Sequence, residues 1–344
     1  MLPLIVWSNG NDGKSQIRRK RSLDLFFLIL LLLLALRATT VGRDLVAYET
    51  FFETISDLPM NDLIDLDMEI GYALLNKLIS LFTNDFQWVI AIVAAISVIP
   101  MWMVYRRESE DAYLSIIVFL IMPVFAMMFS GLRQSIAFSI GFIAFNWVQK
   151  KKPLRFLLTV AIAFLFHKSA LILLILYPLY YAKITKKWLF VVIPAMGVVF
   201  VFNKPIFAFL QDLISDLYST EAQGNSAYTT LILFILFAVF AFVVMDEGKL
   251  KTDEFGLRNI LLLAIVIQMF VPLHTLAMRL NYYFIVFVPL LVAKAIKKRS
   301  QRFNQIAVVA KYLMTVVFVG YFWYNLITRN TLDISPYLFF WEIR

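Results

Sequence analysis

The sequence predicts an all-α fold, that of a polytopic membrane protein. Hydrophobic residues make up 61% of its 344 residues and charged residues only 16%. Soluble domains have about 45–50% apolar and about 25% charged residues. The mean hydropathy is +0.79, and the apolar residues stand in long runs bounded by Lys and Arg. Such runs are typical of helices that cross a bilayer.

Charge and cysteine content exclude several classes of function. The formal net charge is +9, but Lys and Arg gather at the ends of apolar runs, where they set membrane orientation. We therefore expect the lipid bilayer, and no nucleic acid, as a partner. The absence of cysteine excludes disulfides, thiolate catalysis and cysteine metal sites. Because His167 and His274 are the only histidines, we expect no metal, and we expect no cofactor.

The first apolar run, Leu23–Leu36, follows a basic segment at 14–21. A secretory signal peptide has the same order of charge and apolar run. Leu36-Arg37-Ala38 is a poor cleavage site, however. The pattern therefore predicts an uncleaved first span with the N-terminus inside.

Residues 38–85 are predicted to lie outside. The stretch 38–69 carries eight acidic residues and one basic residue, Arg43, which indicates a solvated loop. Glu69–Phe82 then places its apolar residues on one helical face and is too short to span a bilayer. It predicts an amphipathic helix on the outer surface, whose apolar face consists of Ile70, Leu74, Leu78 and Leu81.

The remaining apolar runs alternate in direction, and the basic clusters mark the inside. A second external loop is expected at 203–227, and the aromatic C-terminal tail is expected at the outer interface. The whole chain, 1–344, is thereby predicted to be a single integral membrane domain of about 11 hydrophobic segments. The further spans are Phe86–Tyr105, Ala112–Met128, Gln134–Val148, Trp188–Phe202, Tyr228–Met245, Phe255–Pro272, Thr275–Ala293 and Ile306–Leu326.

One pair of segments is too short. The residues 153–182 lie between two basic clusters that should both be inside. Two full crossings need about 40 helical residues, and only 30 are present. We therefore expect a short re-entrant-like hairpin at 155–182, with His167-Lys168 at its tip below the outer surface. A polar turn at that depth must be buried in protein or line a water-filled cavity.

Three cationic or titratable side chains are expected at similar depth. Arg133 follows the turn Ser130-Gly131, Arg279 stands five residues after His274, and His167 is at the hairpin tip. Arginine suits bidentate binding of phosphate, and helix N-termini add partial positive charge. The pattern predicts a cationic pocket, open to the outside, for a phosphorylated lipid.

Each of these residues also has a purely structural interpretation. Arg133 and Arg279 are long enough to reach the headgroups or to pair with an acid. His167 and His274 fit as packed histidines, and Lys168 fits as an interface anchor. Gln134 and Asn281 fit as hydrogen-bond partners between helices. The sequence leaves these alternatives open.

Short motifs follow one another in a fixed order over nearly the whole chain. They are Gly42-Arg43-Asp44 with Tyr48, Glu69-Ile70-Gly71-Tyr72, Gly131-Leu132-Arg133-Gln134-Ser135, Phe166-His167-Lys168-Ser169, Arg279-Leu280-Asn281-Tyr282-Tyr283 and Ser335-Pro336-Tyr337. In this order they resemble the EpsG family of membrane proteins, which belong to bacterial exopolysaccharide and capsule clusters and are related to Wzy-type polymerases. Ile70 stands where that family more often has proline.

The resemblance implies a polymerase of oligosaccharide repeat units linked to undecaprenyl pyrophosphate, acting at the outer face of the bacterial cytoplasmic (inner) membrane. It also implies a GT-C-like helical bundle that needs no metal. Arg133 and Arg279 are then expected to stabilise the leaving pyrophosphate, and the base is expected to be His167, Asp44 or Glu69. Residues expected to bind substrate are Arg43, Tyr72, Gln134, Lys168, His274, Asn281 and Tyr282.

Other functions compete with polymerisation. A flippase or transporter of lipid-linked sugar needs alternating access, usually with internal repeats, and no convincing repeat is visible. A membrane acyltransferase that modifies the glycan also uses His and Arg within apolar helices. A non-catalytic subunit would associate with other polysaccharide export or assembly proteins. Buried cations at one depth argue for a catalytic role over this last alternative.

Overall fold

The computed structural model describes residues 13–212, 226–300, 304–330 and 332–342. These residues are helical apart from connecting segments and one isolated β-bridge, between Arg37 and Phe339. They form two compact units: the first comprises Met1–Leu171 and Val308–Arg344, and the second comprises Ile172–Ala307. Each unit is described by itself. The single integral membrane domain expected from the sequence stays a prediction.

Few of the described helices are long and apolar enough to cross a membrane as a single unbroken helix. Among the described residues, α5 (Gln87–Glu108) and the segment Ala227–Val244 of α13 (Ser226–Val244) meet the length and hydropathy expected of a span. The number rises to five if each of three bent helix pairs counts as one span. The protein is all-helical, as predicted, but about 11 spans and a GT-C-like bundle are not confirmed. Several predicted spans are instead interrupted by bends.

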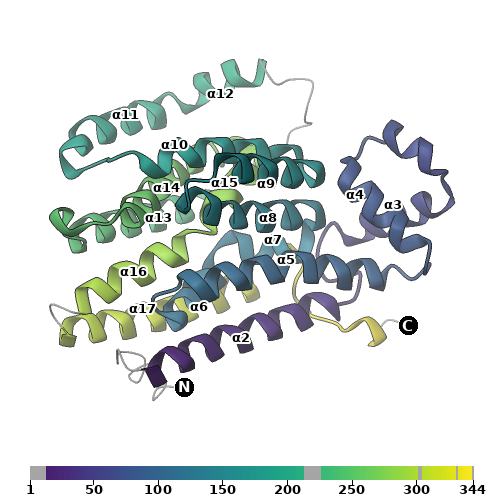
Figure 1. The fold of residues 1–344 in the computed structure, drawn as a ribbon, viewed down its shortest axis with the longest axis horizontal. Helices are drawn as coiled ribbons and strands as arrows, with labels where there is room; N and C mark the ends of the chain where they lie inside the picture. Colours follow the sequence, from purple (N-terminus) through teal and green to yellow (C-terminus); the bar gives the residue numbers. More distant parts are fainter. Residues whose placement is uncertain (1–12, 213–225, 301–303, 331, 343–344) are drawn as a thin grey trace. The chain divides into compact units, whose positions relative to one another are not determined.

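The first unit is built on long helices that pack in sequence. Helix α2 lies beside α5, α5 beside α8, and α8 beside α9 (Figure 1). This order places the N-terminal end of α8 near the segments before α5. The helices are α2 (Gly13–Ala35), α3 (Leu45–Asp57), α4 (Ile70–Ser80), α5, α6 (Ala112–Ile121), α7 (Pro123–Ser130), α8 (Leu132–Gln149), α9 (Pro153–Phe166) and α17 (Asn304–Tyr324).

The predicted span Ala112–Met128 is broken. Helices α6 and α7 meet at 65°, and Met122 between them is extended, with φ −78° and ψ 141°. Pro123 at the start of α7 explains the break, because proline disfavours the helical conformation of the residue before it. The bend sets the direction of α7, which leads into the turn at Ser130-Gly131.

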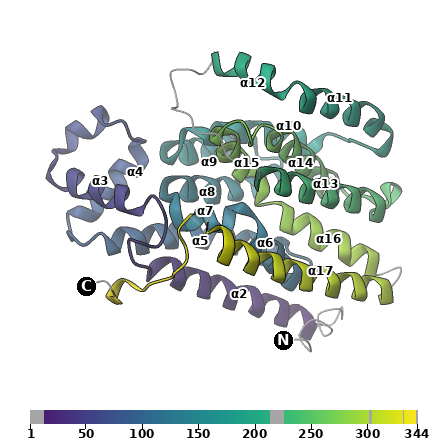
Figure 2. The same ribbon diagram turned by 180° about the vertical axis from the view of Figure 1, so that it is seen from behind.

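The predicted external loop is largely ordered as helix. Helix α3 and the 3-10 helix η2 (Met60–Asp65) occupy much of 38–69. Leu45 and Phe52 of α3 are buried and join a core with Tyr72 of α4 and Phe86. The apolar residues between the acids therefore have enough partners to fold the segment. Figures 1 and 2 show α3, α4 and the C-terminal tail at the same end of α2 and α5.

Helix α4 turns its apolar face outward. Ile70, Leu74 and Leu78 are 40%, 41% and 44% exposed. Asn76 and Lys77 are buried instead. The Lys77 ammonium donates to the carbonyl oxygens of Ile55 and Ser56, at 3.3 and 3.0 Å. This orientation suits a helix that lies in the membrane interface with its apolar side toward lipid.

Helix α9 ends where the sequence predicts a turn. Its 14 residues cover roughly 21 Å at the α-helical rise, less than the ~30 Å hydrocarbon core. His167 caps its C-terminus in an extended conformation, and the 3-10 helix η3 (Lys168–Ile175) follows. The break at His167 is thus present. The depth of this turn in a bilayer stays a prediction.

The second unit centres on α14. Helices α10, α13, α15 and α16 all contact α14, and α13 also contacts α16. The predicted span Thr275–Ala293 is bent by 41° between α15 and α16. Of the predicted loop 203–227, the part 203–212 is helix α12, and 213–225 lies outside the described residues. The helices are α10 (Leu176–Tyr181), α11 (Leu189–Val201), α12 (Asn203–Asp212), α13 (Ser226–Val244), α14 (Thr252–Gln268), α15 (Thr275–Ile285) and α16 (Val288–Ser300).

A close backbone contact fixes α4 against α9, and it yields a prediction. A Cβ atom on Gly71 would lie 2.6 Å from the Leu165 carbonyl oxygen. We expect Gly71→Ala to destabilise the first unit by about 1–3 kcal/mol through overpacking, measured as a lower thermal midpoint of the purified protein in detergent. Gly197→Ala in α11 is the matched control, because nothing lies within 4 Å of its Cβ position. Equal midpoints for the two variants would contradict the contact.

Candidate functional site

The carboxylate of Glu69 joins three segments of the first unit. Glu69 caps the N-terminus of α4 and is 8% exposed. Its Oε2 pairs with the guanidinium of Arg133, from the first turn of α8. Its Oε1 accepts the backbone N–H of Lys168 at 3.2 Å. The start of α4, the start of α8 and the turn after α9 therefore meet at one charged group.

Arg133 keeps hydrogen-bonding capacity beyond this pair. Its guanidinium carbon lies 5.9 Å from the centre of the Tyr48 ring, and Tyr48 in turn contacts Tyr72. The Arg133 side chain is 26% exposed. Its Nε is buried and has no hydrogen-bond partner among the described residues, so donation to a ligand falls to the terminal N–H groups of the guanidinium. Because a guanidinium has five N–H donors, Arg133 retains donors for an anionic ligand.

His167 lies at the same place. It is 5% exposed, and the charge of Glu69 acts on it. Its Nδ1 accepts the backbone N–H of Ser169 at 3.3 Å and lies 2.7 Å from the Ser169 hydroxyl. The Lys168 side chain is exposed, so Lys168 contributes its backbone to the cluster. Arg133 and His167 thus both act on the carboxylate of Glu69, and their predicted shared depth below the outer surface stays a prediction.

The electrostatics keep Glu69 ionised. Burial raises the pKa of Glu69, but the charges of Arg133 and His167 outweigh it, and the pKa falls below its ordinary value of 4.5. Glu69 lies outside the predicted spans. A carboxylate with a lowered pKa is a weak general base. Its geometry and charge therefore favour a role in holding Arg133.

Asp44 lies beside the turn that precedes Arg133. The Ser130 hydroxyl donates to Asp44 Oδ2 at 2.8 Å, and the Asp44 backbone N–H donates to the same hydroxyl oxygen at 3.2 Å. Ser130 is fully buried and Asp44 half-buried. This pair connects the start of α3 to the end of α7. Asp44 thereby belongs to the surroundings of Arg133.

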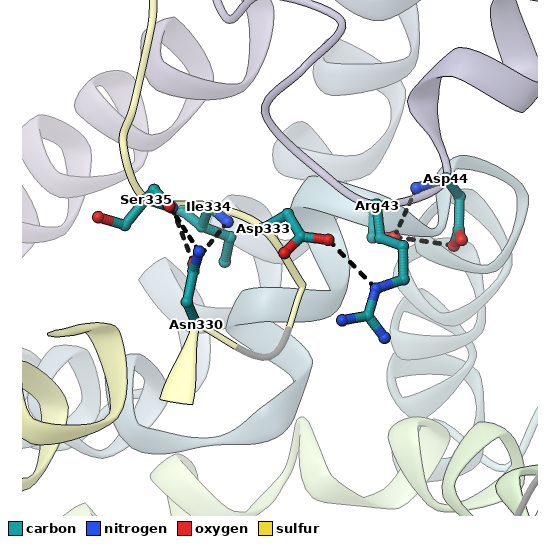
Figure 3. A network of polar contacts seen from close by, with 7 residues as sticks. Arg43, Asp44, Asn330, Asp333, Ile334 and Ser335 are labelled. Carbon is teal, nitrogen blue, oxygen red and sulfur yellow. Dashed lines mark hydrogen bonds and ion pairs between the residues drawn. The ribbon is translucent and has the colours of Figure 1, made fainter. Parts of the chain in front are cut away.

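The C-terminal tail holds the segment that carries Asp44 (Figure 3). Arg43 Nε pairs with Asp333 at 3.2 Å, and the Gly42 and Arg43 N–H groups donate to the Asp333 and Leu332 carbonyls, at 3.0 and 3.1 Å. Asn330 organises the tail by accepting the N–H groups of Ile334 and Ser335. Arg43 is exposed, and its contact with the tail is the role that the structure shows for it.

Gly42 is required where this segment crosses the turn. Its φ is +117°, and a Cβ there would lie 2.0 Å from the Phe129 carbonyl oxygen. Only glycine adopts this conformation readily. Next to it, the buried Arg37 donates to the Leu34 carbonyl at 3.0 Å, and its guanidinium carbon lies 5.6 Å from the Phe129 ring centre. The turn before Arg133 is therefore packed on both sides.

Arg279 and His274 are neighbours in the second unit. His274 caps α15, and its Nδ1 accepts the Leu276 N–H at 2.9 Å. Burial, together with the charge of Arg279, lowers the pKa of His274 below 6.5, so this imidazole is neutral near pH 7. Arg279 is half-buried. Because Arg279 belongs to the second unit, its convergence with Arg133 and His167 stays a prediction.

The other predicted binding residues are buried. Asn281 donates to the Ala264 carbonyl at 3.0 Å and to Gln268 Oε1 at 2.9 Å, so it ties α15 to α14, as the structural alternative expected. Gln134, Tyr72 and Tyr282 are 2%, 0% and 6% exposed. No group of three or more His, Cys, Asp or Glu side chains within the described ranges is placed to hold a metal ion.

Sequence reasoning missed four contributors to the cluster. Ser130 and Ser169 lie in the same motifs as the predicted site residues Arg133 and His167. This closeness in the sequence is the signal that could have identified them. Tyr48 reaches Arg133 from a helix that was expected to be loop. Arg37 is an isolated Arg at the end of an apolar run, and nothing in the sequence distinguishes it from an interface anchor.

The charge of Glu69 yields a prediction. Because its folded pKa is lowered, the stability that ionised Glu69 contributes is present above its ordinary pKa and is lost as the pH falls through the folded value. We expect the thermal midpoint of wild type to exceed that of Glu69→Gln between pH 5 and 8, by an amount that shrinks below about pH 4.5. Glu53→Gln, which removes an exposed carboxylate of α3, is the control. A difference that shrinks already above pH 5.5 would contradict the ion pair.

Comparison with known proteins places the chain in a family. The model of the EpsG family matches residues 21–339. No curated protein and no solved structure shows a significant match. The matched range contains Asp44, Glu69, Arg133, His167 and Arg279 and covers nearly the whole chain. The chain therefore belongs to the EpsG family.

Proposed function

We propose that this membrane protein polymerises lipid-linked oligosaccharide repeat units into exopolysaccharide, capsule or O-antigen. Membership of the EpsG family supports a polysaccharide-polymerase-like membrane protein. The observation that carries the proposal further is the Arg133 guanidinium, which is fixed by Glu69 beside His167 and belongs to a side chain that is 26% exposed. Such a group suits a pyrophosphate.

The reaction is glycosyl transfer to a sugar hydroxyl. The hydroxyl oxygen of one unit bonds to the anomeric carbon of another, and the bond from that carbon to the pyrophosphate oxygen breaks. The lipid pyrophosphate leaves with the electron pair, and the hydroxyl proton passes to a base. Negative charge grows on the leaving oxygen, so preorganised cations are the main catalytic resource.

The residues divide into roles. Arg133 binds the pyrophosphate and stabilises it as it departs, and Arg279 of the second unit acts as a second cation. Glu69 orients Arg133, because its carboxylate is already engaged by Arg133 and by the Lys168 N–H. Asp44, held by Ser130, is the carboxylate best placed in this scheme to receive the proton. The arginines supply the positive charge, and the proposed mechanism needs no metal.

The setting is the outer face of a bacterial cytoplasmic membrane. We place the N-terminus inside and the C-terminus outside, with helices α3 and α4 and the tail toward the exterior. The outward apolar face of α4 supports this placement, since it suits the membrane interface. The donor in this scheme is an undecaprenyl-pyrophosphate-linked oligosaccharide, and export or assembly proteins receive the polymer. A GT-C-like arrangement of the helices is part of the same proposal.

The arginines provide the direct test. We expect Arg133→Ala or Arg279→Ala to lower polymerisation by about 10²–10³, with single repeat units accumulating on the lipid. Arg133→Lys should stay well below wild type, because lysine cannot bind phosphate bidentately. Purified protein is given lipid-linked repeat units, and product length and released lipid pyrophosphate are measured. Arg155→Ala, an exposed arginine near the start of α9, is the control and should leave product length unchanged.

Each competing function predicts a different outcome of this assay. Normal-length polymer from Arg133→Ala would contradict the role of that arginine. Movement of lipid-linked sugar across vesicles without chain growth would indicate a flippase or transporter. Incorporation of an acyl group without chain growth would indicate an acyltransferase.

A further inference from the structure

The C-terminal tail, residues 332–342, is paired with the segment that follows α2. Two backbone hydrogen bonds, at 2.9 and 3.0 Å, flank the antiparallel bridge between Arg37 and Phe339. The Tyr337 hydroxyl donates to the Leu33 carbonyl, in the last turn of α2, at 2.9 Å. One end of the tail is therefore fixed against the end of α2.

The other end of the tail is held in a backbone conformation that most residues avoid. Asn330 and Asp333 have φ of +35° and +53°, in the left-handed region that Asn and Asp adopt more readily than other residues with a side chain. The Asn330 Oδ1 accepts the N–H groups of Ile334 and Ser335, at 3.0 and 2.9 Å. The Asp333 N–H donates to the Asn330 carbonyl at 3.1 Å. The Asn330 side chain and backbone thus fix a sharp bend.

This bend presents two carbonyl groups to the segment that carries Asp44 (Figure 3). The Gly42 N–H donates to the Asp333 carbonyl at 3.0 Å, and the Arg43 N–H donates to the Leu332 carbonyl at 3.1 Å. Gly42 itself has φ +117°, so three of the four positive φ values among the described residues lie in this segment and this bend. Unusual backbone persists where its surroundings over-determine it, and it gathers at functional sites.

The same segment contacts the turn before Arg133. A Cβ on Gly42 would lie 2.0 Å from the Phe129 carbonyl oxygen, so the two backbones touch. The Asp44 N–H and carboxylate both bond to the Ser130 hydroxyl, at 3.2 and 2.8 Å. Asp44 is therefore held by Ser130 through its own atoms and by the tail through the two residues that precede it.

We infer that Asn330 is a positioning residue for the reaction: it fixes the bend whose carbonyl groups hold the backbone next to Asp44, and so keeps Asp44 where it receives the proton of the attacking hydroxyl. The inference rests on the proposed function. In that step the hydroxyl oxygen bonds to the anomeric carbon, its proton passes to the Asp44 carboxylate, and the lipid pyrophosphate leaves with the electron pair. A displacement of about 1 Å at a reacting group can lower the rate by about 10²-fold.

Substitutions at Asn330 test the positioning role with purified protein and lipid-linked repeat units. Asn330→Ala removes the acceptor and disfavours the positive φ, so we expect kcat to fall by about tenfold or more, with KM little changed. Asn330→Asp keeps the accepting oxygen and should restore most of kcat. Thr328→Ala is the control, because this exposed hydroxyl donates only to the Tyr324 carbonyl in the preceding helix. Wild-type kcat in Asn330→Ala would overturn the inference.

Substitutions at Asp333 separate the bend from the ion pair with Arg43. Asp333→Gly removes the carboxylate but suits the positive φ. We expect it to keep kcat within about threefold of wild type, because an ion pair between exposed side chains contributes little. Asp333→Val opposes the positive φ and should lose as much activity as Asn330→Ala. A valine variant as active as the glycine variant would contradict the role of the bend.

A double-mutant cycle tests whether the tail acts through Asp44. In protein that already carries Asp44→Asn, the group that the bend positions is absent. Adding Asn330→Ala should then lower the remaining activity by less than about twofold. The full loss in both backgrounds would show that the tail does not act through Asp44, and would overturn the inference.

Hydrogen exchange gives an answer that does not depend on turnover. The N–H groups of Gly42 and Arg43 are bonded to the tail, so we expect slow exchange in wild type and in Thr328→Ala. Asn330→Ala and Asp333→Val should speed exchange there without lowering the thermal midpoint of the protein in detergent. Unchanged exchange would overturn the inference even if polymerisation is confirmed. Normal polymer from Arg133→Ala would instead count against the proposed function, with the exchange result unaffected.

Discussion

The ion pair between Glu69 and Arg133 is the constraint on which the rest of the first unit depends. It joins the start of α4 to the start of α8, and the Lys168 N–H brings the end of α9 to the same carboxylate. Removing one partner of a buried pair leaves an uncompensated charge and is strongly destabilising. The three segments are therefore held in one arrangement, and the arginine is held with its remaining donors in a fixed place.

The irregular parts of the backbone lie near this pair. The bend at Met122-Pro123 directs α7 toward the Ser130-Gly131 turn, and the extended residue His167 ends α9 beside Glu69. Backbone that departs from helix within a membrane is tolerated where protein buries it or water reaches it. The helix breaks at Met122-Pro123 and His167 interrupt predicted membrane-spanning segments, and the same breaks bring the residues of the candidate site together.

The two histidines share one local arrangement in different units. Each stands at the boundary of a helix, and each accepts the backbone N–H of the residue two positions later at Nδ1. In His274 burial and Arg279 also disfavour the charged form, because both lower its pKa.

The sequence by itself determined the class of the protein, the amphipathic character of α4 and the break at His167. These features follow from local periodicity and from counting residues against the thickness of a bilayer. Only the tertiary structure decided that Asp44 meets Ser130, that Lys77 is buried, and that the tail holds Arg43. Glu69 and Arg133 are 64 positions apart, and Arg43 and Asp333 are 290 apart. Local sequence patterns do not predict such distant partners, because each contact depends on how several helices pack against one another.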